Sequence, residues 1–218
     1  MKIQAFILFL IFSFSVNLNA QTKATQSKPK KPQTTDENWK ILQTATAQML
    51  MENYEPAIEN YQLFISKVYD QELKHSAYGD LGYCLSQTHD YQGAIPYLTK
   101  YINYFNPNEL TTIKIEKVNT TNQLIGKYLI QRGFCKSKLE DVNGAEIDLT
   151  RGIDFMEVLI KSPKNKEDWN YHTLGFGYLM RGLAKMQMNK GKIFCEDLRK
   201  SIDYGFTPGI ELVKNYCN

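Results

Sequence analysis

The sequence lacks the residues and motifs from which most catalytic sites are built. Its three histidines are His75, His89 and His172, and none has metal-ligand spacing to a Cys, an Asp or a second His. No glycine-rich phosphate loop and no Gly-x-Ser-x-Gly elbow occurs. The acidic pairs Glu140-Asp141 and Glu196-Asp197 are expected at helix starts, where carboxylates favour the helix dipole. We therefore predict a protein that is not an enzyme and that uses no metal and no cofactor.

A strongly basic domain is also missing. The chain holds 26 Lys and Arg against 23 Asp and Glu, a formal net charge of +3. Five of the lysines lie in residues 1–35, so residues 36–218 hold 21 basic and 23 acidic residues, a net charge of −2. Nucleic-acid binding needs a basic face, and we expect no nucleic-acid partner.

Long hydrophobic runs are absent except at the N-terminus. Residues 5–16, AFILFLIFSFSV, follow Met1-Lys2 and precede the small residue Ala20. This order is typical of a secretory signal peptide, residues 1–20, with cleavage after Ala20. An uncleaved anchor is the alternative, but a membrane-spanning helix needs ~20 apolar residues. We expect a periplasmic or extracellular protein that has no membrane span after signal cleavage.

Residues 21–35, QTKATQSKPKKPQTT, contain no large apolar side chain. Such a segment cannot form a core, and we expect a disordered tether. Residues 36–218 are then long enough for one domain with one continuous core.

Residues 77–104, AYGDLGYCLSQTHDYQGAIPYLTKYINY, predict two amphipathic helices joined by a tight turn. The helices are expected at roughly 76–87 and 91–104. Gly82 and Ala94, twelve residues apart, remove side-chain bulk where the two helices cross. The pattern resembles a tetratricopeptide repeat (TPR), a helix-turn-helix unit of 34 residues.

Further copies follow from the same spacing. Small residues twelve apart recur at Ala45/Ala57 and at Gly133/Ala145. A fourth copy is built around Gly182, but Phe194 stands where a small residue is expected. Either this last helix pair is splayed or its register shifts by one residue. Insertions at 106–123 and 157–170 separate the later copies. We expect the first insertion to form a short helix or to lengthen the next one, and the second to contain a polar loop.

The C-terminal segment 208–217, PGIELVKNYC, predicts a short amphipathic helix that covers the apolar face of the last repeat. Together with CEDLRKSIDYGF before it, this end resembles that of many exported TPR proteins of Gram-negative bacteria. The resemblance implies an all-α fold. We expect a right-handed solenoid of about four TPR-like helix pairs in residues 36–218, with a C-terminal capping helix.

Four cysteines allow three disulfide pairings, and their spacing alone does not choose among them. The resemblance implies a possible disulfide between Cys195 and Cys217, which would hold the cap on the array with roughly 3 kcal/mol of chain-entropy stabilisation. Cys84 and Cys135 occupy the same position in successive copies, so their helices are ~8–10 Å apart. That exceeds the reach of a disulfide, and two buried free thiols are expected.

The resemblance also implies a concave groove lined by the first helix of each pair. The positions one, four and five after the small residue are then Tyr83, Ser86, Gln87, Phe134, Ser137, Lys138, Leu183, Met186, Gln187, Thr46, Met49 and Leu50. Leu50 and Leu183 are expected to be core residues instead. The remaining mixture favours an extended peptide or a partner helix over a peptide carboxylate.

Two functions from different classes fit these residues. The first is an exported, non-catalytic TPR protein that acts as a protein-protein interaction scaffold or adaptor in the cell envelope, with another protein or peptide as partner. The alternative is an envelope accessory protein that captures a glycan or peptide in its concave groove. That alternative needs an aromatic platform, for which Tyr83 and Phe134 are the candidates.

Overall fold

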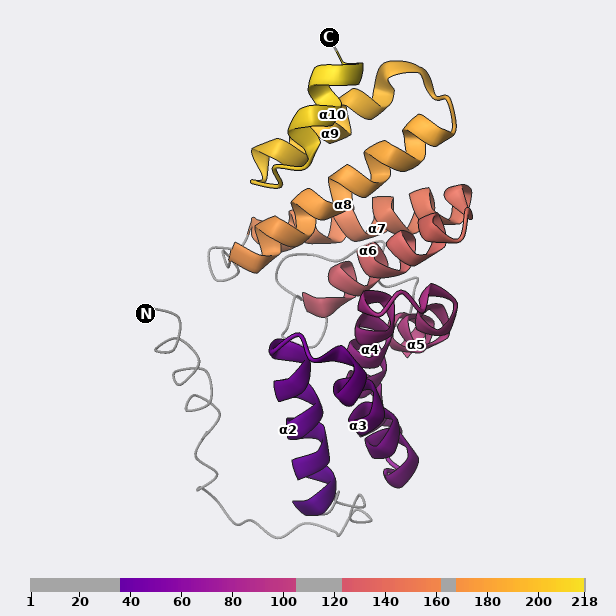
Figure 1. Ribbon diagram of the computed structural model, residues 1–218, viewed down its shortest axis with the longest axis vertical. Coiled ribbons are helices and arrows are strands. Elements are labelled where there is room, and N and C mark those ends of the chain that lie inside the picture. Colours follow the sequence, from indigo (N-terminus) through magenta and orange to yellow (C-terminus); the bar gives the residue numbers. More distant parts are fainter. Residues whose placement is uncertain (1–35, 105–122, 162–167, 218) are drawn as a thin grey trace, which may run out of the picture. The chain divides into compact units, whose positions relative to one another are not determined.

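The structure is a computed structural model that describes residues 36–104, 123–161 and 168–217. The predicted signal peptide 1–20, the tether 21–35 and nearly all of the insertion 106–123 lie outside the described residues, as does the loop 162–167. Within the described ranges every regular element is a helix (Figure 1).

Four helix pairs and a terminal helix follow one another along the chain. The helices are α2 (Asp36–Leu50), α3 (Tyr54–Lys67), α4 (Gln71–Gln87), α5 (Tyr91–Tyr104), α6 (Gln123–Lys138), α7 (Val142–Ile160), α8 (Asp168–Gln187), the 3-10 helix η4 (Gly191–Ile193), α9 (Phe194–Asp203) and α10 (Gly209–Tyr216). Each α-helix packs on the next, and the first helices α2, α4, α6 and α8 also contact one another in order. The prediction of an all-α array of TPR-like pairs with a capping helix is confirmed.

The turn inside each pair has the same backbone conformation in all four copies. A non-glycine residue seven positions after the small residue has positive φ, from 51° to 69°: Glu52, His89, Glu140 and Asn189. The N–H of the following residue then donates to the carbonyl five residues back, as Asp90 does to Leu85 at 2.9 Å. This Schellman-type bond satisfies a carbonyl at the helix end and reverses the chain.

Glycine permits the close crossing of the two helices in a pair. A Cβ at Gly82 would lie 2.7 Å from Cγ of Leu98, and one at Gly133 would lie 2.7 Å from Cγ of Leu149. Real Cβ atoms do not approach side chains so closely, because overpacking forces the backbone apart. The positions of the small residues in the sequence therefore indicate where the two helices of a pair cross.

The last pair keeps the register of the others despite Phe194. Gly182 faces Leu198, sixteen residues later, as Gly133 faces Leu149. The irregularity is local, since η4 takes the place of the first α-helical turn and α9 starts only at Phe194. The alternative of a one-residue register shift is wrong.

Two of the pairs contain a buried ionic clamp. The Arg132 guanidinium donates to both carboxylate oxygens of Asp148 at 2.7 Å, and Nζ of Lys136 lies 2.9 Å from the same carboxylate. Arg181, Lys185 and Asp197 repeat this arrangement in the α8/α9 pair.

Asp197 thus has a different role from the one predicted for the acidic pairs. It lies in the first turn of α9, but its buried carboxylate neutralises two cations of α8. Asp141 does match the expectation of a helix start, since its side chain caps α7 by accepting from the N–H of Gly144.

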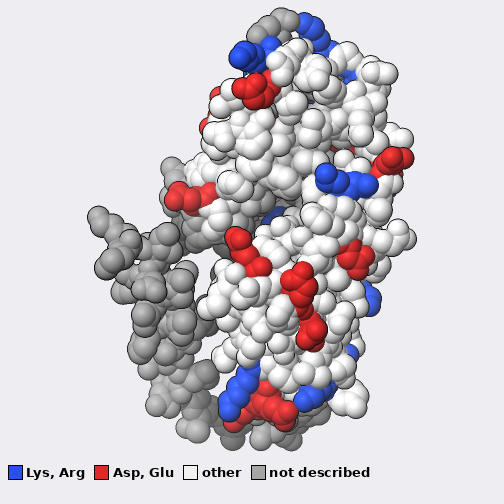
Figure 2. Space-filling view, in the orientation of Figure 1, with Lys and Arg blue, Asp and Glu red and all other residues white. Residues whose placement is uncertain are grey.

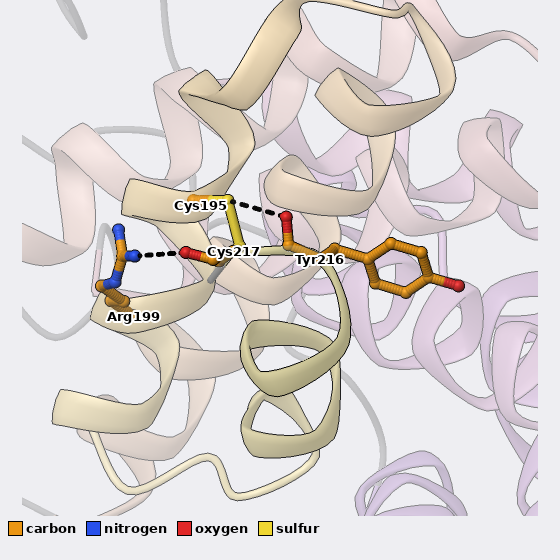
Figure 3. Close-up of a disulfide and its surroundings, with 4 residues drawn as sticks. All are labelled: Cys195, Arg199, Tyr216 and Cys217. Carbon is orange, nitrogen blue, oxygen red and sulfur yellow. Dashed lines mark hydrogen bonds between the residues drawn. A yellow bond between two sulfur atoms is a disulfide. The ribbon is translucent and has the colours of Figure 1, made fainter.

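The arginine of each clamp also reaches back to the preceding pair. Nη1 of Arg132 donates to Thr99 on α5, and Nη1 of Arg181 to Thr150 on α7. The equivalent position in the last pair is Arg199, which donates to the carbonyl of Cys217 at 3.1 Å (Figure 3). The second and third pairs have a threonine at this position, which accepts a hydrogen bond from the next pair. The last pair has an arginine instead, which donates a hydrogen bond to the cap.

A disulfide joins Cys195 on α9 to Cys217 at the end of α10 (Figure 3). Cys84 and Cys135 are buried free thiols, and burial raises the pKa of each to about 12. None of the described helices has the length and apolarity that crossing a membrane requires.

Candidate functional site: two hollows along the first helices

The first helices α4, α6 and α8 enclose a cavity of about 360 Å³, named here the aromatic hollow. Its residues come from α4, the turn after it, α6, the first three turns of α8 and the segment after α9. They are Tyr83, Ser86, Gln87, His89, Lys127, Ile130, Gln131, Phe134, His172, Thr173, Phe176 and Phe206. The last three helix pairs therefore contribute to one surface.

A row of aromatic rings runs along this hollow, and all of them except Tyr91 belong to its lining. The Phe134 ring lies 5.6 Å from Tyr91 and 5.5 Å from Phe176, measured between ring centroids. Phe206 continues the row, 5.7 Å from Phe176 and 5.0 Å from His172. Tilted and edge-to-face contacts at these distances are the favoured geometry of aromatic pairs. Because all five rings keep some exposure, the row offers a rigid apolar surface to a ligand.

The polar floor of the hollow is already hydrogen-bonded. Nε2 of Gln131 donates to Oγ of Ser86 at 2.5 Å, and the Ser86 hydroxyl donates to the carbonyl of Tyr83 at 2.6 Å. Both side chains are buried. Ser86, predicted as a groove contact, therefore joins α4 to α6 below the surface that a ligand would touch.

One lysine stands at the edge of the hollow. Nζ of Lys127 lies 4.4 Å from the centroid of the Tyr83 ring, a cation–π distance. Burial lowers the pKa of the Lys127 ammonium, while the carboxylate of Asp80 opposes that shift. Asp80 accepts from the hydroxyl of Tyr128 at 2.6 Å and contributes no side chain to the lining.

A second cavity of about 590 Å³ lies further along α6 and α8, and it is named here the methionine hollow. It is lined by Ser137, Lys138, Glu140, Met180, Leu183, Met186, Gln187 and Asn189. Thioether and aliphatic side chains form its apolar part. Such side chains adapt to varied partners.

The structure divides the predicted groove residues between these two hollows. Tyr83, Ser86, Gln87 and Phe134 lie in the aromatic hollow, and Ser137, Lys138, Met186 and Gln187 lie in the methionine hollow. Leu183, predicted as a core residue, is half-buried and also lines the methionine hollow.

The predicted groove positions of the first repeat line neither hollow. Thr46 and Met49 contact the buried hydroxyl of Tyr61. The prediction that Leu50 is a core residue is wrong, because its side chain is 74% exposed. Leu50 is the last residue of α2, and the described chain places no helix over it.

Several lining residues were absent from the sequence prediction. Lys127 and Ile130 stand six and three positions before Gly133, about two turns and one turn earlier on α6. His172 and Thr173 lie ten and nine residues before Gly182, near the start of α8, which begins already at Asp168. The helical period could have found the first two, whereas the early start of α8 follows a polar segment without a clear capping signal.

The charge on this surface is sparse. Among the twelve residues that line the aromatic hollow are one lysine and two histidines, with no Asp or Glu. Figure 2 shows a face of the molecule that is mostly uncharged, with acidic and basic side chains in small separate groups. In the described part of the chain, no three His, Cys, Asp or Glu side chains converge as metal ligands would.

Comparisons with known proteins add a single similarity. No protein-family model matches the chain, and no curated protein sequence does. Among solved structures, the TPR2AB-domain:pHSP90-complex of yeast Sti1 is similar, with a TM-score of 0.40 and 13% sequence identity over 83% of this chain and 86% of that one. A similarity of this size says nothing about partners, and the description of the fold depends on the helix pairs themselves.

Proposed function

We propose that this protein is an exported, non-catalytic interaction scaffold of the cell envelope, which binds an extended segment of a partner protein on its concave face. The observation that carries the proposal is the aromatic row from Tyr91 through Phe134 and Phe176 to Phe206. Clustered aromatic side chains dominate the binding energy of protein interfaces. Here the rings come from three helix pairs, pack against the core on one side and keep part of their surface exposed.

The polar groups around the row fit a peptide backbone. The amide of Gln87, the imidazole of His89 and the hydroxyl of Thr173 lie among the lining residues, each on a half-buried or exposed side chain. A site of this kind combines apolar contact with a few orienting hydrogen bonds. An extended peptide presents both, through alternate side chains and free backbone groups.

The export part of the proposal has separate support. Residues 1–20 have the pattern of a signal peptide. The disulfide between Cys195 and Cys217 is of the kind that forms in oxidising compartments. Detection of the protein in envelope or secreted fractions, with an N-terminus at Gln21, is the expected result. An N-terminus at Met1 would contradict it.

Glycan capture is the second candidate, and the half-buried rings of Tyr83 and Phe134 favour it. Sugar rings stack on such faces, and the amide of Gln87 lies in the same hollow. The affinity for a glycan would depend mainly on stacking against the ring faces and less on the depth of the hollow. Arrays of extended peptides and of envelope glycans, probed with the same purified protein, distinguish the two candidates.

Substitution within the row tests the site. Phe134→Ala and Phe176→Ala should each weaken peptide binding by roughly tenfold or more, because truncation of an interface hot spot costs at least about 2 kcal/mol and each 1.4 kcal/mol is tenfold in affinity. The control is Tyr69→Ala, which removes an aromatic side chain that is 90% exposed and outside both hollows. Circular dichroism verifies that each variant keeps its helices. Unchanged affinity in both phenylalanine variants, with helices intact, would contradict the proposal.

A further inference from the structure

The two hollows lie one after the other along the same two helices. On α6 the lining passes from Phe134 in the aromatic hollow to Ser137 and Lys138 in the methionine hollow. On α8 it passes from Phe176 to Met180 in the same direction. A ligand that lies along α6 and α8 therefore meets the hollows in a fixed order.

The helices provide a scale for the distance between the hollows. Their linings are displaced by roughly two turns along α6 and three along α8, and a turn rises 5.4 Å, so the centres are ~11–16 Å apart. An extended chain rises ~3.3 Å per residue and turns every second side chain to the same side. Side chains two apart are separated by ~7 Å, four apart by ~13 Å and six apart by ~20 Å. Only the spacing of four fits.

We propose that the partner segment is an extended peptide with two anchors four residues apart, an aromatic side chain in the aromatic hollow and an aliphatic or methionine side chain in the methionine hollow. This inference rests on the proposed function and specifies the ligand of the same surface. Aromatic rings around the first hollow favour an aromatic anchor through edge-to-face contact. Thioethers around the second accept an aliphatic anchor of varied shape.

The charge of the lining narrows the peptide further. Each hollow has one lysine from α6, Lys127 in the first and Lys138 in the second. The only acidic residue among the two linings is Glu140, at the outer end of the second hollow. The carboxylate of Asp80 offsets the charge of Lys127, so we expect neutral residues beside the aromatic anchor.

A helical partner makes a different demand on spacing. At a rise of 1.5 Å per residue, ~11–16 Å corresponds to anchors about seven to eleven residues apart. The anchor spacing that gives the tightest peptide binding will therefore distinguish an extended ligand from a helical one. Dimerisation through this face would instead make binding of short peptides compete with self-association.

The test uses the protein expressed from its full-length sequence and fluorescein-labelled peptides that carry one Phe and one Leu in a Ser/Gly background. The separation varies from two to eleven residues, in both Phe-first and Leu-first order, and fluorescence polarisation gives Kd. The expected result is a sharp optimum at four in one of the two orders, with affinity falling roughly tenfold at two and at six.

Variants assign each anchor to its hollow. Phe176→Ala should abolish the gain from the peptide's Phe and leave the gain from its Leu, and Met186→Ala should do the reverse. Tyr69→Ala and Met51→Ala serve as matched controls, since Tyr69 is 90% and Met51 63% exposed and neither lines a hollow.

The possible outcomes separate this inference from the proposed function. An optimum at seven or more residues would overturn the extended ligand. Binding that is independent of spacing, yet lost in Phe134→Ala, would overturn the two-anchor inference and leave the proposed function standing. Absence of binding by every peptide at millimolar concentration would overturn both. An affinity that depends only on protein self-association would identify a second copy as the occupant and overturn the peptide.

Discussion

The first two helix pairs and the last two reach the same architecture with different chemistry. Before the crossing glycine, the second pair has the buried apolar residue Leu81, whereas the third and fourth have Arg132 and Arg181. On the facing helix, Tyr97 in the second pair corresponds to Asp148 and Asp197. The first pair has a neutral hydrogen bond between Asn60 and Gln48 there and the second has apolar and aromatic side chains, whereas each of the last two pairs has a buried ionic clamp.

The connections between pairs explain where the clamps occur. The first two pairs follow each other with only residues 68–70 between α3 and α4. The third and fourth pairs come after insertions, so the chain itself constrains their placement less. In both, the clamp arginine also donates to a threonine of the preceding pair. Directional bonds of this type select one register, which apolar packing alone specifies less sharply.

The largest effect is expected from breaking a clamp. Asp148→Asn keeps the shape of the side chain but leaves Arg132 and Lys136 without their carboxylate. Loss of one partner from a buried ion pair typically costs about 3–5 kcal/mol. The free energy of unfolding, measured by urea denaturation, should fall by an amount in that range.

Two further variants establish that burial causes this loss. Glu196→Gln removes the carboxylate of an exposed pair with Lys200 and should cost less than ~1 kcal/mol. Arg132→Leu, Lys136→Leu and Asp148→Tyr together copy the second pair, whose residues there are Leu81, Leu85 and Tyr97. If the triple variant is less stable than Asp148→Asn alone, the clamp does more than balance its own desolvation.

The cap is the second point at which the two halves differ. Replacing Cys195 and Cys217 by Ser opens a covalent loop with a sequence separation of 22. The chain-entropy model assigns such a loop roughly 3 kcal/mol. We expect that loss in the free energy of unfolding and rapid amide exchange throughout α10. Dithiothreitol should reproduce the effect in the unmodified protein and change nothing in the double variant. Protection of α10 without the disulfide would mean that Arg199 suffices.

Most of the architecture could be predicted because small residues at a fixed spacing leave a direct trace in the sequence. Gly82 and Gly133 are required because a Cβ there would lie less than 3 Å from a leucine, so the sequence reveals where these helices cross. The clamps were visible only as Arg-Gly and Asp-Leu pairs shared by two copies. No local sequence pattern indicates that the arginine side chain contacts the aspartate sixteen residues later.

The candidate site was predictable only in part, for a similar reason. Tyr83 and Phe134 follow from their position relative to the small residues, and they do line one hollow. The division into two hollows depends on the early start of α8 and on Phe206, which reaches the site from beyond α9. Such contributions come from tertiary packing, which a repeat pattern does not encode.

Substitution of the crossing glycines compares the pairs directly. Gly82→Ala and Gly133→Ala each place a methyl group 2.7 Å from a buried leucine, and overpacking of this kind costs about 1–3 kcal/mol. At Gly182 the nearest atom is 3.0 Å away, and the facing helix α9 has an irregular first turn. We expect the smallest loss for Gly182→Ala. Equal losses in urea denaturation at all three sites would show that the last pair is as tightly crossed as the others.

The smallest effect expected is a pH dependence confined to the first half of the array. Burial lowers the pKa of His75 from 6.5 to about 4, and its ring stacks on Tyr101 and Tyr104 at 4.4 and 4.0 Å. Between these two pKa values the unfolded chain binds a proton that the folded protein does not. The stabilisation that neutral His75 gives to the folded protein is therefore complete above pH 6.5 and declines as the pH falls towards 4.

His75→Phe keeps the stacking and removes the titrating group. The drop in unfolding free energy between pH 7 and pH 5 should be shallower in this variant than in the unmodified protein. His172→Phe, at an exposed position of α8, controls for the exchange of imidazole for a phenyl ring. Amide exchange then locates the effect: at pH 5 the unmodified protein should lose protection in α4 and α5 before α8 and α9. Simultaneous loss of protection in all four helices would mean that the half of the array without clamps and the half with clamps unfold as one unit. The two halves would then have the same local stability despite their different chemistry.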